Sequence, residues 1–142
     1  MLDDKEMLQF IMKTAEMGCR GINAIKHYAN FEEMSNALRS QNIEYGRIYH
    51  NAYNMLRERN QPSCHVSPMS NSMAKMVVNR QMKNDSSDPH IAEMMIRGNT
   101  IGVQKTSRRI RQYNKSDESI SKLAQKLMAT EQANIEEMKS YL

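Results

Sequence analysis

The chain has 142 residues, with 20 lysines and arginines against 16 aspartates and glutamates, and so carries a formal net charge of +4. This length fits a single domain over residues 1–142, and a hydrophobic content of 39% argues against wholesale disorder. We expect a cytoplasmic protein without a membrane partner, because no apolar run approaches the roughly 18 to 20 residues of a membrane span and the acidic N-terminus does not resemble a secretory leader.

A helical hairpin is predicted over residues 3–60. Apolar and small residues recur there with alternating spacings of three and four, which is typical of helices packed in a bundle. The two series are Leu8, Ile11, Ala15, Gly18, Ile22, Ile25 and Ala29, then Met34, Leu38, Gln41, Tyr45, Ile48, Ala52 and Met55. Asn30 and Glu33 have the spacing of a capping box that starts the second helix, and Pro62 ends that helix near Asn60.

A connecting segment, residues 61–88, separates this hairpin from the next one. It is rich in Ser, Asn and Met, and Ser67-Pro68 favours the start of a short helix. Within that helix Met69, Met73 and Met76 form one apolar stripe. The stripe is suited to capping the bundle or to meeting a second subunit.

A second helical hairpin is predicted over residues 89–142. Asp88 followed by Pro89 indicates a cap with proline at the first helical position, and the helix runs towards Tyr113. After a turn at 114–117, the last helix carries one face formed by Ile120, Leu123, Leu127, Thr130, Asn134, Met138 and Tyr141. Two hairpins joined by a long crossover with a short extra helix predict an all-α four-helix bundle.

A faint internal repeat relates the two hairpins. With an offset of 84, the segment 16–18 falls on 100–102, and with an offset of 87, Glu44 falls on Glu131. This organisation resembles the ferritin-like superfamily, in particular rubrerythrin-type bundles and small bacterial bundles of unassigned function. The resemblance implies that each helix pair gives a Glu from its first helix and Glu-x-x-His from its second, which together hold two metal ions.

The metal-site positions that the resemblance implies are only partly occupied by ligands. They are Glu16, Glu44, Arg47, Thr100, Glu131 and Asn134. Three carboxylates of four remain, neither histidine does, and an arginine places a fixed positive charge where a dication should sit. Arg47 can instead pair with Glu44 or Glu131 and neutralise a buried carboxylate. We therefore interpret the site as vestigial and expect no cofactor, with iron or manganese as the alternative.

Two further histidine positions are secondary metal candidates. His90 and Glu93 lie three residues apart, a spacing that lets two side chains share a metal ion, although Glu93 can equally pair with Arg97. His50 lies about two turns beyond Glu44 and reaches the core only if the helical register drifts. Two ligands alone are a weak signal for a metal site.

The positive charge is confined to one part of the chain. Residues 61–115 hold nine basic and three acidic side chains, whereas residues 1–60 are neutral overall. An acid-free run on the third predicted helix contains Lys105, Arg108, Arg109, Arg111 and Lys115. Such a run can bind nucleic-acid phosphates, but cations at a helix C-terminus are also favoured by the helix dipole.

The function that these patterns favour is a non-catalytic interaction or structural module that forms a homodimer. One alternative is an oxidoreductase or store that uses a reduced metal site. The other is a nucleic-acid-associated protein that uses the basic run. No motif identifies a protein partner.

Overall fold

A computed structural model describes the backbone of residues 1–142, together with the side chains of residues 1–68 and 75–142. It contains the helices α1 (Asp4–Ile25), α2 (Glu32–Glu58), α3 (Pro68–Asn84), α4 (Asp88–Gln112) and α5 (Glu118–Lys139), with a 3-10 turn at Lys26–Tyr28. The prediction of an all-α chain is confirmed. Among the described residues, no helix combines the length and hydrophobicity that crossing a membrane requires.

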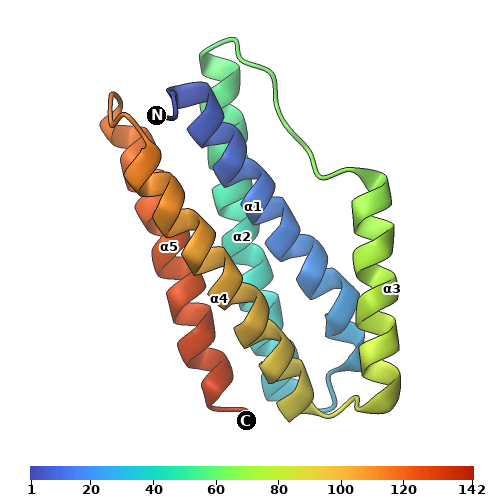
Figure 1. Cartoon of the computed structure of the whole chain (residues 1–142). Helices are drawn as coiled ribbons and strands as arrows, with labels where there is room; N and C mark the ends of the chain where they lie inside the picture. The colour runs from blue at the N-terminus through green and yellow to red at the C-terminus, as the bar shows by residue number, and fades with distance from the viewer.

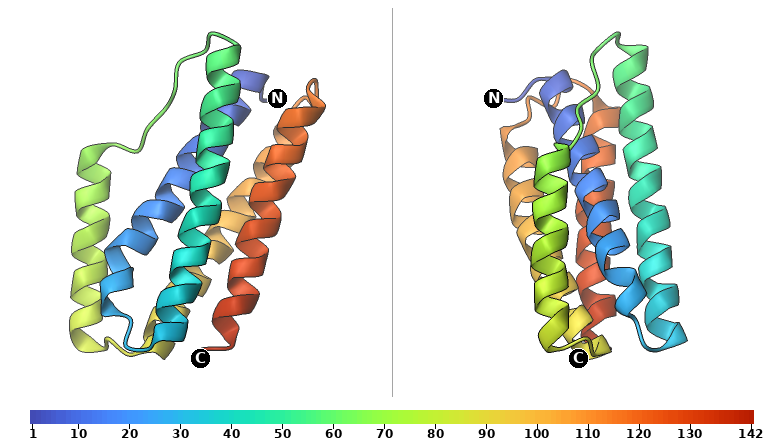
Figure 2. Two further views of the ribbon diagram at one scale, coloured as in Figure 1. Left: turned by 180° about the vertical axis from the view of Figure 1, so that it is seen from behind. Right: turned by 90° about the vertical axis from the view of Figure 1, so that its right-hand side faces the viewer.

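The helices form two antiparallel pairs and one helix outside them. α1 pairs with α2 and α4 pairs with α5, while α3 runs along the outer side of α1 (Figures 1 and 2). Because α3 returns the chain along the bundle, α2 and α4 run in the same direction (Figure 1). The extra helix of the crossover is 17 residues long, so it is not the short element that was predicted.

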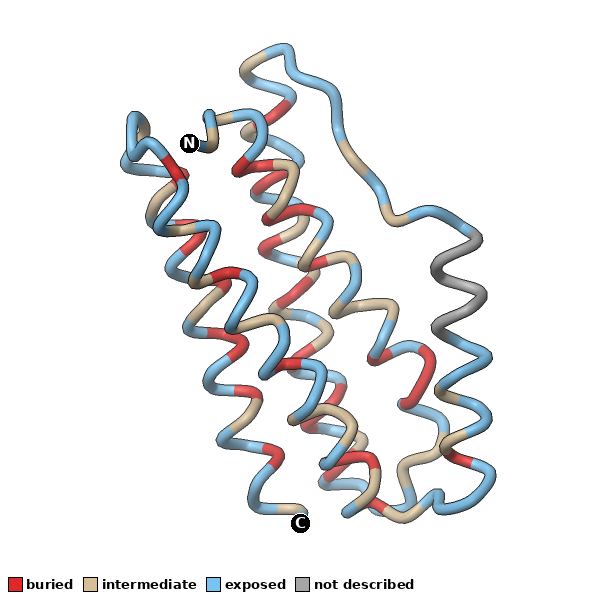
Figure 3. Tube along the Cα trace, in the orientation of Figure 1, coloured by how far each residue is buried: buried red, intermediate tan, exposed pale blue. Residues whose placement is uncertain are grey.

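The predicted seams form the core, as the inward-facing buried positions in Figure 3 show. The seam residues that are buried are Leu8, Ile11, Ala15, Ile22, Ile25, Met34, Leu38, Gln41, Tyr45, Ile48, Ala52, Ile120, Leu123, Leu127, Thr130, Asn134 and Met138. Gly18, Ala29, Met55 and Tyr141 are partly buried. The spacing of three and four therefore located the buried face of three helices.

The start of α2 is capped differently from the prediction. Asn30 and Glu33 form no capping box, and Phe31 is the N-cap without a side-chain hydrogen bond. Instead, the buried Asp88 carboxylate accepts hydrogen bonds from the backbone N–H of Asn30 at 2.8 Å and of Phe31 at 3.2 Å. Because Asp88 is used in this way, Ser87 takes over as the N-cap of α4.

Replacing Asp88 with alanine is expected to lower the free energy of unfolding by about 2 kcal/mol, because two backbone N–H donors at the start of α2 lose a charged acceptor. Asp88→Asn keeps one acceptor oxygen and should lose less. Ser87→Ala removes only a local cap and should cost about 1 kcal/mol. Urea unfolding measures all three, and an Asp88→Ala value no larger than that of Ser87→Ala would contradict the cross-chain role.

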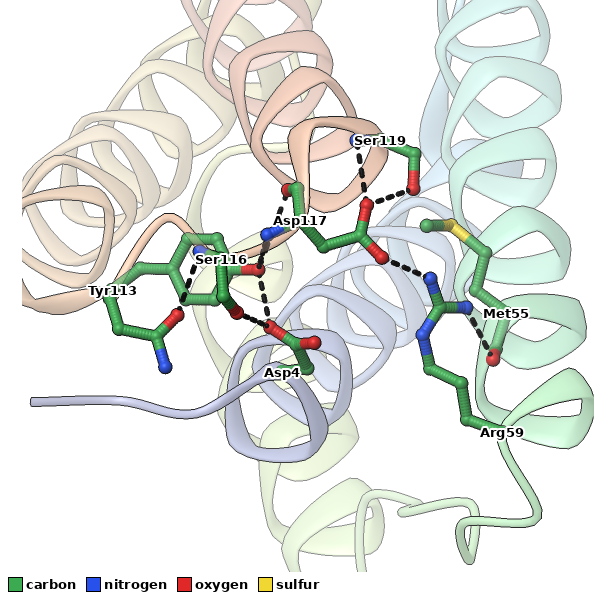
Figure 4. Close-up of polar contacts among 8 residues, drawn as sticks. Asp4, Met55, Arg59, Tyr113, Ser116, Asp117 and Ser119 are labelled. Carbon is green, nitrogen blue, oxygen red and sulfur yellow. Dashed lines mark hydrogen bonds and ion pairs between the residues drawn. The ribbon is translucent and has the colours of Figure 1, made fainter.

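At the opposite end of the bundle, a set of polar contacts joins three elements (Figure 4). Asp117, at the start of α5, pairs with Arg59 at the end of α2 and accepts a hydrogen bond from the Ser119 hydroxyl. These two contacts, with Ser119 first, lower the pKa of Asp117 to about 2. Asp4 of α1 accepts hydrogen bonds from the hydroxyls of Tyr113 and Ser116, both at 2.6 Å. The contacts fix the α4–α5 turn against both helices of the first hairpin.

Candidate functional site

A group of polar side chains lies in the core of the bundle. Its buried members are Gln41, Tyr45, Asn99, Thr106, Thr130, Glu131 and Asn134. They come from α2, α4 and α5, and each needs partners because an unpaired polar group inside a protein costs free energy. Their partners therefore decide what this part of the core can do.

Glu131 is the acidic member of the group, and it is only 2% exposed. Its Oε1 accepts a hydrogen bond from the Thr106 hydroxyl at 2.7 Å. Its Oε2 lies against α4, 1.7 Å from the point that a Cβ on Gly102 would occupy, so any larger residue at this position would require the carboxyl to move. Burial raises the pKa of Glu131 to about 7, against the lowering effect of the Thr106 bond. Near neutral pH the carboxyl is therefore protonated in a large fraction of molecules.

Tyr45 is the member of the group on α2 that lines the same cleft as Glu131. Its hydroxyl donates a hydrogen bond to Asn99 Oδ1 at 2.6 Å, and the Asn99 amide donates to the Met95 carbonyl at 2.8 Å. Burial and, secondly, the Glu131 charge raise the pKa of Tyr45, so its hydroxyl remains a donor. The ring packs on Gly18, where an added Cβ would lie 2.7 Å from it.

A cleft of about 260 Å³ opens between α1 and α4 above this polar group. Tyr45 and Glu131 form part of its floor, and its walls are mainly apolar. Met17 and Ile101 lie at the cleft with 54% and 48% of their surface exposed, which is high for large apolar side chains. The cleft is therefore the place where the core polar group faces a concave, apolar surface.

The structure places Glu16 away from this group. Its carboxylate accepts a hydrogen bond from the Val66 backbone N–H and lies 3.5 Å from both Arg20 and His65. These contacts hold the start of the crossover segment against α1. Glu16 therefore faces the 61–67 connection and does not join the core polar group.

Glu44 and Arg47 also lie on the surface of the bundle. Glu44 pairs with Lys126 at 3.1 Å and with Arg47 at 3.3 Å. Lys126 first, and Arg47 in addition, lower the pKa of Glu44. The predicted pairing of Arg47 with Glu44 is thus present, but Arg47 is 71% exposed and neutralises no buried carboxylate.

Of the six implied positions, Glu131 and Asn134 are in the core and Thr100 is not. Thr100 is exposed and bonds its own helix at Ile96, while the preceding residue, Asn99, is buried. Among the side chains that the structure describes, no three histidine, cysteine or acidic groups come together as a metal site. The residues present do not fit a di-metal centre, because its ligands are dispersed over separate contacts.

The secondary metal candidates have other partners. His50 is exposed and makes an edge contact with Tyr49, with ring centroids 5.4 Å apart. His90 Nδ1 lies 3.6 Å from Glu93, so Glu93 pairs within the first turn of α4 rather than with Arg97. No third ligand accompanies either histidine in residues 1–68 and 75–142.

The basic run is solvent-exposed at all five positions, Lys105, Arg108, Arg109, Arg111 and Lys115. Lys115 lies outside α4, which ends at Gln112, in the turn predicted over 114–117, with a φ of 59°. Arg109 stacks over the Phe10 ring at 5.5 Å, and Arg111 bonds Ser107. Within the described part of the chain, none of the five forms an ion pair with a carboxylate.

Asn99 and Thr106 were predicted neither as site residues nor as seam positions, and the cleft beside them was not predicted. A signal for the two side chains was available, because Ala92, Asn99, Thr106 and Tyr113 are spaced by seven residues and all are buried. Comparison with profiles of protein families, with curated proteins and with solved structures gives no match to this chain.

Proposed function

We propose that the chain is a non-catalytic interaction or structural module of ferritin-like origin, cytoplasmic and bacterial, whose core works without a metal ion. The observation that carries this proposal is that Glu131 enters the core as a lone carboxyl, hydrogen-bonded to Thr106. Burial favours its protonated form, so no cation is needed to balance it. Glu16 and Glu44 are already paired with basic side chains elsewhere.

The internal repeat supports the ferritin-like origin. Gly18 and Gly102 coincide under the offset of 84, and each lies against a side chain of the second helix in its own hairpin. For Gly18 that side chain is Tyr45, and for Gly102 it is Glu131. An ancestral hairpin with a glycine at this contact, followed by loss of ligands, accounts for both.

Titration of the metal-free protein with Fe(II) or Mn(II) is expected to show no stoichiometric binding, because the ligands that a di-metal site needs are dispersed. Elemental analysis of the protein as isolated gives the second measurement. Stoichiometric binding that disappears in the Glu44→Ala/Glu131→Ala double variant would instead favour the metal-using oxidoreductase or store. A salt-sensitive DNA gel shift weakened by Arg108 and Arg109 substitutions would favour the nucleic-acid alternative.

The partner that we propose for the module is a second copy of the chain, docked on the outer face of α3. Met76 and Val77 are 63% and 52% exposed there, while Met82 on the opposite side is buried. Met69 and Met73, which were predicted to share the stripe, lie outside the described side chains. Exposed apolar neighbours on a helix are typical of an interface.

Sedimentation velocity at micromolar concentration is expected to give a dimer for the wild type and a monomer for Met76→Glu/Val77→Glu. Two charges cannot be buried in the interface without partners. Ile43→Glu, on the exposed side of α2 at 51% exposure, is the matched control and should remain dimeric. A monomeric wild type would remove the proposed partner.

A further inference from the structure

The cleft between α1 and α4 is apolar at one end and cationic at the other. Because the two helices are antiparallel, Ile25 of α1 lies at the same end as Met94 of α4, and Thr14 lies at the same end as Lys105 (Figure 1). From Met94 to Lys105 the cleft follows α4 for roughly 16 Å at 1.5 Å per residue. Ile25 is buried, and Val78 of α3 also lines the cleft.

Two exposed glycines line the cleft at positions where a larger side chain would meet open space. An added Cβ at Gly21 or at Gly98 would meet no atom within 4 Å. Glycine inside a helix costs about 1 kcal/mol relative to alanine, so these positions give up stability for open space. Gly21 belongs to α1 and Gly98 to α4, so each of the two helices lacks a side chain at one position along the cleft.

The cationic end of the cleft has one charge, on Lys105, that no described carboxylate neutralises. Lys105 is exposed and, among the described side chains, has no carboxylate partner. Arg109, one turn later on α4, does not line the cleft, and its guanidinium stacks over the Phe10 ring of α1. An anionic group at this end of the cleft would therefore meet Lys105.

The floor of the cleft also favours an uncharged or anionic ligand over a cationic one. Glu131 lines the cleft and is only 2% exposed. Its Oε1 accepts the hydrogen bond from Thr106, and its Oε2 makes no hydrogen bond to the described residues. Burial favours its protonated form, so it offers no fixed negative charge. As a neutral acid it can donate a hydrogen bond from Oε2 into the cleft.

We propose that this cleft binds a single amphiphile, a medium-length alkyl chain with a carboxylate head. The alkyl chain lies between the two glycines with its end at Ile25 and Met94, and the head lies at Lys105. A volume of about 260 Å³ is just below the range of about 300–1,000 Å³ for drug-sized ligands, which limits the occupant to a small one. The interaction module would then bind a small molecule. This proposal rests on one part of the proposed function, namely that the core holds no metal ion.

Isothermal titration calorimetry with decanoate, below its micellar concentration and at about pH 6, tests the proposal on the full chain after treatment with a chelator. We expect one decanoate per chain, and binding at least about tenfold weaker for decanol and for decyltrimethylammonium. Lys105→Glu should weaken decanoate about tenfold and leave decanol unchanged, whereas Arg111→Glu, away from the cleft, should change neither by more than about twofold.

Filling the cleft provides the second test. Gly98→Leu and, from the other wall, Gly21→Leu should each abolish measurable decanoate binding while thermal unfolding shows a folded protein. Gly46→Leu is the matched control, because a Cβ at Gly46 on α2 also meets no atom within 4 Å and Gly46 does not line the cleft. Absence of decanoate binding, equal binding of the cationic amphiphile, or binding that survives both filled variants would overturn the proposal. Because the protein is metal-free here, a positive metal titration would refute the proposed function without deciding this one.

Discussion

Replacing Glu131 with glutamine is expected to raise the free energy of unfolding by about 3 kcal/mol at pH 8 and to change it little at about pH 4. The pKa of Glu131 rises from 4.5 in the unfolded chain to about 7 in the folded protein. Below the unfolded value both states hold the proton, and burial of the neutral carboxyl carries no charge penalty. As pH rises through 4.5 to 7, the unfolded chain releases the proton first, so the native protein loses stability.

Glutamine suits this comparison because it matches the protonated carboxyl in shape and keeps an oxygen that can accept the Thr106 bond. Urea unfolding between about pH 4 and pH 8 gives the measurement, and the variant should show a flatter profile than the wild type. Glu44→Gln is the control, because Glu44 is a surface carboxylate whose pKa is lowered by Lys126. Its substitution should slightly lower the free energy of unfolding at every pH at which the carboxylate is ionised. Parallel pH profiles for wild type and Glu131→Gln would show that the buried carboxyl is ionised without cost.

The architecture was predictable because burial of a helix face leaves a periodic trace in the sequence. The seam of α5 from Ile120 to Met138 is buried at every predicted position, although it includes the polar residues Thr130 and Asn134. A spacing of three and four is a property of the helix itself and survives when the side chain at a seam position is polar. The all-α fold followed from this local information.

The site was less predictable because it depends on contacts between distant segments. Asp88 caps α2 across 58 residues, and Glu16 accepts its hydrogen bond from Val66 across 50 residues. Neither contact leaves a pattern along the chain. Predicting the metal positions also required the correct helical register. The predicted position on α4 was Thr100, which is exposed, whereas the buried residue is its neighbour Asn99.

The glycines divide into two classes whose alanine variants should change stability in opposite directions. At Gly102 an added Cβ would overlap Glu131 Oε2 at 1.7 Å, and at Gly18 it would lie 2.7 Å from the Tyr45 ring. We expect Gly102→Ala and Gly18→Ala to lower the free energy of unfolding by about 1–3 kcal/mol, which is typical of overpacked cores. Both contacts are overlaps, with a carboxylate oxygen at the end of the Glu131 side chain in one case and with ring atoms of Tyr45 in the other.

At Gly21 and Gly98, by contrast, the added methyl group meets open space, and alanine has the higher helix propensity. Gly21→Ala and Gly98→Ala should therefore raise the free energy of unfolding by about 0.5–1 kcal/mol each. Urea unfolding of the four variants measures both classes under one condition. Destabilisation by Gly98→Ala would mean that α1 and α4 close on each other in solution and that no cleft separates them.

The overlap at Gly102 can be separated from a general defect in α4 by a double-mutant cycle. Glu131→Ala removes the carboxylate that the new methyl group would strike, so Gly102→Ala should cost much less in that background than in the wild type. The expected coupling is about 1–2 kcal/mol in the direction of rescue. Additive effects would show that Glu131 moves aside without cost, and the carboxyl would then not be held against the α4 backbone. Rescue would show that the packing of α4 on α5 at this point depends on one glycine and one buried acid.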